Sequence, residues 1–345
     1  MSEKTESYMR EKNGKKKPLR QPLRQPLRQP LRQRIRQRAG VSAHLWKISL
    51  HRYWQLYLLL VPVIANFVIF HYIPMAGIQI AFKDFTIRDG IWGSAWAGFE
   101  HFIRFFTSYN FWTILGNTLI LSLLSLAFSF PLSICLALVL NEIRVKKLNS
   151  ALQTVFFAPH FVSTVVVVGM MQAFLSPNTG IVNILLKNLG IIGEGIYFTR
   201  LPEYFRPMYI ISGLWQNTGW SAAIYLSALT AIDQELYEAA RVDGASRWQQ
   251  LTRITIPCIV PTIVIQLILK CGHIMSVGYE KVLLMQTSTN LSVSQIISTY
   301  VYDRGISNQQ YDYATAIGLF NSVINVIVLL LVNRISRKKS DVSLW

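Results

Sequence analysis

The stretch DQELYEAARVDGASRWQQLTRITIPCIVPT, residues 233–262, decides the fold of this chain. It is polar and charged, and apolar runs of membrane length lie on both sides of it. Asp233 is suited to cap a helix, because its carboxylate can accept hydrogen bonds from first-turn amides, and Glu235 follows in the positive first turn. A polar helical loop of this kind is expected to contact another protein, since nothing in a bilayer requires it.

A sharp turn is predicted in the middle of this loop. Gly244 can adopt the left-handed conformation that closes a first helix. Ser246 and Gln249 form an S-x-x-Q capping box that begins a second helix. The run 254–257, Ile-Thr-Ile-Pro, is expected to end the second helix and to lead back into the membrane. The predicted order is helix, tight turn, helix over about 233–257, a segment called the polar loop below.

The composition is that of a membrane protein, with 52% hydrophobic and 15% charged residues. A membrane-spanning helix needs about 20 mainly apolar residues. The sequence therefore predicts an all-α integral membrane protein with six transmembrane helices in a domain at 41–340, with the polar loop between spans four and five. The predicted spans are 54–81, 112–140, 152–175, 208–231, 258–277 and 314–333.

The basic residues outside these spans predict the orientation. Arg144, Lys146 and Lys147 follow span two, and a second basic cluster at 334–339 follows span six. Lys and Arg are enriched in cytoplasmic loops, so these segments and the basic N-terminus are placed in the cytoplasm. Both termini and the polar loop are thus expected on the cytoplasmic side of the plasma membrane.

The N-terminal segment differs from the rest of the chain. Residues 1–52 hold 15 of the 34 Lys and Arg but only 3 of the 17 Asp and Glu, which accounts for most of the net charge of +17. The unit Pro-Leu-Arg-Gln repeats four times over 18–33. Regular proline forbids a continuous helix. Residues 1–40 are predicted to be a disordered cytoplasmic arm, either a tolerated repeat that helps to fix topology or a segment that attracts anionic lipid.

The polar loop resembles the EAA loop of binding-protein-dependent ABC importer permeases. The resemblance rests on Glu238-Ala239-Ala240, on Gly244 four residues later, and on Ile254 to Pro257 after nine more residues. Ile256 stands where the family usually has Leu, a swap of similar volume. In that family the loop docks into a cytoplasmic ATPase and transmits its closure. The resemblance assigns ATPase coupling to Glu238, Ala239, Ala240, Asp243, Gly244, Ile254 and Pro257.

A finer resemblance is to the carbohydrate-uptake branch, most of all to permeases for complex or uronate-containing oligosaccharides. It is carried by the segments 54–62, 69–84, 277–284 and 298–320. It implies a second permease subunit, an ATPase dimer, an extracytoplasmic solute-binding protein and an oligosaccharide cargo. The expected protein is a bacterial, non-catalytic permease subunit that needs no cofactor of its own, since the partner ATPase binds ATP. A permease for another solute, such as a peptide or an amino acid, is the alternative.

Polar residues inside the predicted spans are candidates for the substrate path, because ionisable groups in lipid are costly. Lys270 lies well inside span five, and His273 follows at helical spacing. Span four carries Trp215, Asn217 and Trp220, a mixture of rings and amides that suits sugars. Helix packing explains the span-four residues equally simply, and an acid on a partner subunit would explain Lys270.

Enzyme chemistry is not visible in the sequence. There is no P-loop pattern GxxxxGK[ST], so the chain is not expected to hydrolyse ATP. Cys135, Cys258 and Cys271 have no metal-ligand spacing and are expected to be small hydrophobes. No metal, and no nucleic-acid partner, is predicted. A membrane-bound enzyme or sensor would need a catalytic constellation that does not stand out here.

Overall fold

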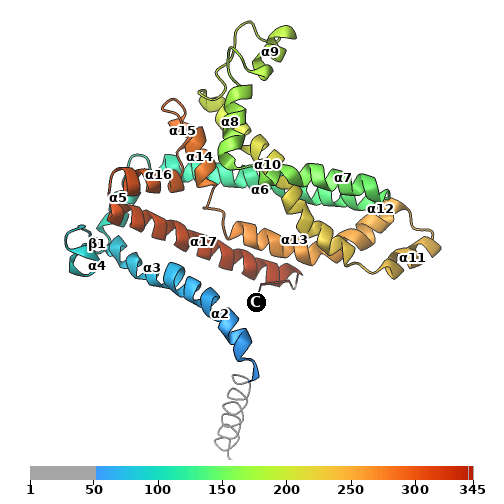
Figure 1. Cartoon of the computed structure of the whole chain (residues 1–345), viewed down its shortest axis with the longest axis horizontal. Coiled ribbons are helices and arrows are strands. Elements are labelled where there is room, and N and C mark those ends of the chain that lie inside the picture. Colours follow the sequence, from blue (N-terminus) through green and yellow to red (C-terminus); the bar gives the residue numbers. More distant parts are fainter. Residues whose placement is uncertain (1–51, 341, 345) are drawn as a thin grey trace, which may run out of the picture. The chain divides into compact units, whose positions relative to one another are not determined.

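The computed structural model describes residues 52–340 and 342–344 (Figure 1). The predicted arm at 1–40 lies outside the described residues. The described residues divide into two compact units, the first ending at Pro74 and the second beginning at Met75. In the first unit, helix α2 (Trp54–Phe67) runs into a π-helical turn (Val68–Tyr72). None of the residues in α2 is buried, and a helix that is apolar all round is suited to lipid or to a partner subunit.

The second unit begins with short elements. Helix α3 (Ile73–Met75) crosses the boundary and leads into a 3-10 helix (Ala76–Phe82). Strands β1 (Lys83–Asp84) and β2 (Ala95–Trp96) pair antiparallel around α4 (Gly90–Gly93). Helix α5 (Glu100–Phe106) follows. The remaining helices are α6 (Phe111–Glu142), α7 (Lys146–Phe157), α8 (Thr164–Phe174), α9 (Ile181–Asn188), α10 (Pro202–Thr230), α11 (Gln234–Val242), α12 (Arg247–Gln250), α13 (Ile256–Cys271), α14 (Tyr279–Met285), α15 (Leu291–Ser294), α16 (Ile297–Tyr302) and α17 (Tyr311–Ser340).

The core of the second unit is formed where long helices cross. Helix α10 packs along α6, and α17 packs against α13, α5 and α16. Three apolar clusters fill these contacts. One surrounds Phe105 and Tyr313, the second surrounds Phe205 and Val282, and the third surrounds Tyr225 and Ile259.

The membrane-protein fold predicted from the sequence is confirmed. Within the described residues, four helical runs are long and apolar enough to cross a membrane, and a bent pair makes a fifth. The runs are Trp54–Phe82, Phe111–Glu142, Arg247–Cys271 and Tyr311–Lys338. The predicted fourth span corresponds to α10, which is about 43 Å long at 1.5 Å per residue. Its polar residues lower its mean hydropathy, so it is not one of these runs, although it is long enough to cross a membrane.

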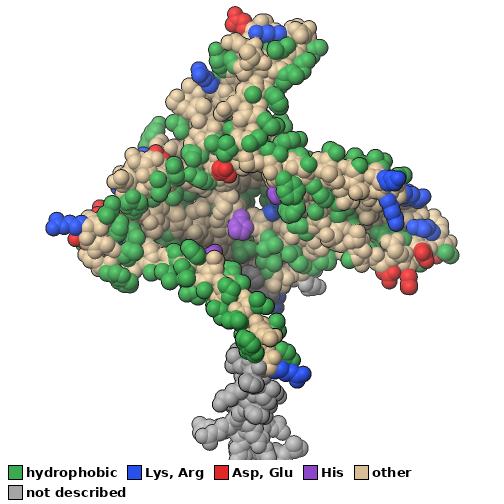
Figure 2. All heavy atoms as spheres, viewed as in Figure 1, with side chains coloured by type: hydrophobic (Ala, Val, Ile, Leu, Met, Phe, Trp, Pro, Cys, Tyr) green, Lys and Arg blue, Asp and Glu red, His purple; other side chains and the backbone are tan. Residues whose placement is uncertain are grey.

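The surface of the molecule exposes many large apolar side chains, as expected of a membrane protein. Figure 2 shows hydrophobic side chains spread over much of the visible face, and acidic and basic side chains mainly at the projecting ends, including the end that carries α11 and α12. Helix α9 projects beyond α8 in Figure 1. Its base is held by Asn183, a buried residue whose amide donates to three backbone carbonyls and accepts from the Ile196 amide.

Candidate functional site

The first half of the polar loop folds as its local chemistry predicts. The Asp233 carboxylate accepts a hydrogen bond from the Glu235 amide at 3.0 Å and caps α11. The helix closes at Gly244, whose φ of +75° is the left-handed conformation expected there. Ser246 and Gln249 then form the capping box that begins α12. The turn in the middle of the loop is thus set by short-range hydrogen bonds and one glycine.

The second half of the loop corrects the prediction that 254–257 ends the helix. Helix α12 continues through a π-helical turn (Leu251–Thr255) into α13, so that Arg247–Cys271 is one helical run. Pro257 lies just after this π-helical turn and does not end the helical run. Thr255 donates to the Gln250 carbonyl and accepts from the Tyr237 hydroxyl at 2.9 Å. The loop is therefore joined rigidly to the membrane helix.

The loop presents apolar side chains outward. Val242 is 88% exposed, and Leu236 and Trp248 are also exposed. Glu238 and Ala239 are exposed on α11 as well. Between α11 and α12 lies a cavity of about 320 Å³, lined by residues that include Ala240, Asp243, Gly244 and Ile254. Exposed apolar residues beside a hollow are suited to receive another protein.

The third predicted span is a broken helix in the structure. Helix α7 and the turn after it meet α8 at 95°. The turn is a 3-10 helix (Ala158–Phe161) with Pro159 near its start, and Ser163 caps α8 by accepting from the Val166 amide. Helix α10 passes so close to the break that a Cβ on Gly219 would lie 2.0 Å from the Phe156 carbonyl oxygen. Only glycine permits this approach.

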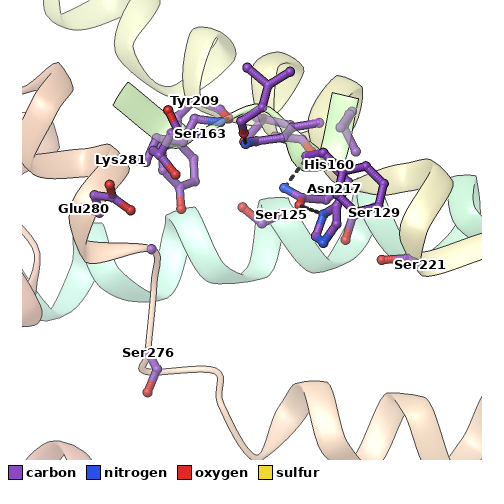
Figure 3. A pocket seen from close by; sticks show the side chains of 18 of the residues that line it. Ser125, Ser129, His160, Ser163, Tyr209, Asn217, Ser221, Ser276, Glu280 and Lys281 are labelled. Atoms are coloured by element: carbon purple, nitrogen blue, oxygen red, sulfur yellow. Dashed lines mark hydrogen bonds between the residues drawn. The ribbon is translucent and has the colours of Figure 1, made fainter. Parts of the chain in front are cut away.

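A large cavity of about 810 Å³ opens beside the break. It is lined by α6, the broken helix, α10, α13 and the chain that follows α13 (Figure 3). Gln216 is buried and donates to the Val162 carbonyl at 2.8 Å. His160 donates from Nδ1 to the Asn217 amide oxygen at 3.1 Å. The wall thus combines serine, amide and imidazole groups with apolar surface, a mixture suited to a polyhydroxylated ligand.

Two lysines and one acid also line this cavity: Lys270, Lys281 and Glu280. Lys281 on α14 is only 7% exposed. Its ammonium donates to the Tyr209 carbonyl at 3.1 Å and lies 5.0 Å from the centre of the Tyr209 ring. Burial lowers the pKa of the Lys281 amine to about 8. At pH 7 the amine still carries its charge for most of the time.

Known proteins resemble this chain over most of its length. Residues 129–341 match the family described as "Binding-protein-dependent transport system inner membrane component". The chain belongs to this family of permeases. It is 44% identical to Protein LplB of Bacillus subtilis, over 85% of this chain and 92% of that protein. It is 43% identical to the polygalacturonan/rhamnogalacturonan transport system permease protein YteP of the same organism, over 86% of this chain and 92% of that protein.

Solved structures agree with these sequence matches. A chain of a bacterial ABC transporter involved in the import of the acidic polysaccharide alginate superposes on this permease with a TM-score of 0.78. The two are 45% identical, and the match covers 86% of this chain and 99% of the other. A second structure shows a bacterial alginate transporter with a periplasmic protein that holds an alginate pentasaccharide. Its matched chain gives the same TM-score at 44% identity, over 87% of this chain and 99% of that one.

The structure places the predicted substrate-path residues of this permease in different surroundings. Asn217 and Lys270 line the large cavity. His273 lines a smaller adjoining cavity of about 240 Å³, which Lys270 also reaches. Trp215 and Trp220 are half-exposed and line neither of these two cavities. Trp220 instead stacks on the His160 ring, with ring centres 4.7 Å apart.

The sequence did not indicate that Tyr209, Lys281 and His160 line the cavity of this permease. Tyr209 reads as an ordinary aromatic of a span, and Lys281 follows Glu280 in a segment that reads as an exposed connection. His160 follows Pro159 inside a predicted span, which is a signal for a break. The described residues hold no group of three or more His, Cys, Asp or Glu side chains that could bind a metal ion.

Proposed function

We propose that this permease is the transmembrane subunit of an ABC importer and forms part of the path by which an acidic oligosaccharide enters the cytoplasm. A separate ATPase supplies the energy, and this chain itself carries out no catalysis. The observation that supports this most is the match to the permease of the alginate importer, which extends over 99% of that chain. The large polar cavity, with its lysines, is in keeping with such a cargo.

The polar loop is proposed to receive the ATPase. Its exposed apolar residues and the hollow beside Gly244 offer a docking surface. The continuous helical run from Arg247 to Cys271 would carry a push on the loop into the membrane helix that bears Lys270. Closure of an ATPase dimer would thus tilt the wall of the cavity without any hinge between α12 and α13.

The family also supplies the expected partners. A second permease would complete the path, and an extracytoplasmic solute-binding protein would deliver the oligosaccharide. A permease for peptides or amino acids is the second candidate, since the polar loop alone does not distinguish cargo. The permeases of polygalacturonan/rhamnogalacturonan and of alginate transport favour the sugar.

Transport by the reconstituted complex tests the proposal. The complex is purified from its host through a tag on this chain and placed in proteoliposomes with the binding protein. We expect ATP-dependent uptake of an oligouronate such as tetragalacturonate, and no uptake of a tetrapeptide of similar mass. Uptake of the peptide and not of the oligouronate would show that the cargo is a peptide. Uptake that persists without ATP would overturn the assignment to an ATP-driven importer.

A further inference from the structure

Lys281 is the most buried charged group at the large cavity, and its charge is not neutralised within the described chain. No described carboxylate forms an ion pair with it. An ammonium has three hydrogen-bond donors, and the Tyr209 carbonyl is the one acceptor it finds among the described residues. A buried cation in this state is costly unless an anion reaches it.

Lys281 lines the cavity, and its ammonium has donors left over after the bond to the Tyr209 carbonyl. Tyr209 holds the ammonium from one side, through its carbonyl and through the face of its ring. In the view of Figure 3, Lys281 and Tyr209 lie at one end of the cavity, and His160 and Asn217 lie at the other. A ligand several sugar units long could therefore place an anionic group at one end and hydroxyls at the amides of the other.

We propose that Lys281 binds a carboxylate of the transported oligosaccharide and selects acidic over neutral cargo. This proposal rests on the proposed function, because it assigns a role inside the same path. It differs from a role for Lys270, which lies on α13 and reaches both cavities. Glu280 acts in the opposite sense, because it is an exposed acid at the wall of the same cavity.

Binding of free trisaccharides to the complete complex in nanodiscs tests the proposal without the selectivity of the solute-binding protein. The probes are trigalacturonate and its methyl ester, which has the same chain but no charge. Lys281→Met keeps the aliphatic stem and removes the ammonium. We expect it to weaken trigalacturonate binding by about tenfold, the size of one charge-assisted hydrogen bond, and to leave ester binding unchanged.

Three further variants sharpen the test. Lys281→Arg keeps the charge and should keep the preference for the acid. Glu280→Gln should strengthen acid binding by a smaller factor, because it removes a repulsive charge. Lys187→Met removes an exposed cation of α9 that lines neither cavity, and should change neither affinity.

The outcomes separate the possible failures. Equal losses for acid and ester in Lys281→Met, or a complex that no longer assembles, would show that the lysine is a structural tie between α14 and α10, which overturns the proposal. Unchanged binding of both probes would overturn it as well. If the unmodified complex binds the ester as well as the acid, the permease function stands and charge selection fails. If it neither binds nor transports any oligosaccharide, the proposed function itself fails.

Discussion

The polar loop and the large cavity are assembled over different distances along the chain. The hydrogen bonds that cap the helices of the polar loop and form the turn between them join residues two to five positions apart, as in the cap at Asp233 and the capping box at Ser246. The cavity is lined by residues that lie between 125 and 281 in the sequence. The first region is therefore determined by local chemistry, and the second depends on how whole helices pack.

The largest expected effect follows from the local character of the loop. Gly244→Val places a β-branched residue at a φ of +75°, a conformation that costs about 1–3 kcal/mol for residues other than glycine. The turn between α11 and α12 should open and misplace the surface proposed to meet the ATPase. We expect loss of oligosaccharide transport and of cargo-stimulated ATP hydrolysis in the reconstituted complex, with normal membrane insertion.

Matched variants show whether the backbone or the surface is responsible. Gly244→Asn should keep most of the activity, because asparagine tolerates the left-handed region. Glu238→Lys leaves the turn intact and reverses a charge on the exposed face of α11, and it too should uncouple transport. Normal stimulated hydrolysis in Gly244→Val would remove this turn from the coupling path.

The sequence predicts the polar loop well because each signal lies beside its effect. Gly244, the cap at Asp233 and the box at Ser246 all appear in the structure as expected. The end of the second helix was predicted wrongly, because Pro257 reads as a helix stop. In the structure Pro257 follows a π-helical turn inside a helical run that continues to Cys271, so it does not end the helix.

The cavity could be predicted only in part, for the opposite reason. Lys270 was visible as a charge inside an apolar run, but Lys281 lies outside every predicted span and becomes buried only when α14 packs on α8, α10 and α16. No local pattern reports that packing. The 95° break after α7 also determines which residues line the cavity, and its only local signals are Pro159 and the cap at Ser163.

A smaller effect is expected where helix packing shapes the cavity. Gly219→Ala would bring a Cβ to 2.0 Å from the Phe156 carbonyl oxygen, so α10 must move away from the broken helix. Overpacking of this kind costs about 1–3 kcal/mol. We expect a lower Tm of the purified complex and weaker trigalacturonate binding, because Gln216 and Asn217 lie within one turn of the glycine.

Gly169→Ala on α8 is the matched control, because a Cβ there meets no atom within 4 Å. It should leave binding unchanged and stabilise the helix by at most about 1 kcal/mol. An equal Tm for the two variants would mean that the close approach of α10 to the broken helix does not hold the cavity in shape.

The smallest effect concerns pH. Burial lowers the pKa of the Lys281 amine to about 8, so the amine is charged below that pH and neutral above it. Carboxylate binding favours the charged form, and trigalacturonate affinity should therefore fall as pH rises through 8 toward the higher pKa of the bound state. The fall should be no more than about tenfold between pH 7 and 9, because only one charge is lost. Binding of the methyl ester should not change.

Lys270 is the other amine that lines the large cavity, and a variant of Lys281 distinguishes the two. Helix α8 carries no titratable side chain, and carboxyl and phenol groups ordinarily ionise near 4 and 10. The titratable neighbours on α14 and on the parts of α10 and α16 near it are Tyr209, Tyr279, Glu280, Tyr300 and Tyr302. Lys281→Arg should abolish the pH dependence, because a guanidinium stays charged throughout this range while Lys270 remains free to titrate. A transition that survives in Lys281→Arg would assign the pH response to Lys270 and leave selection by Lys281 without this support.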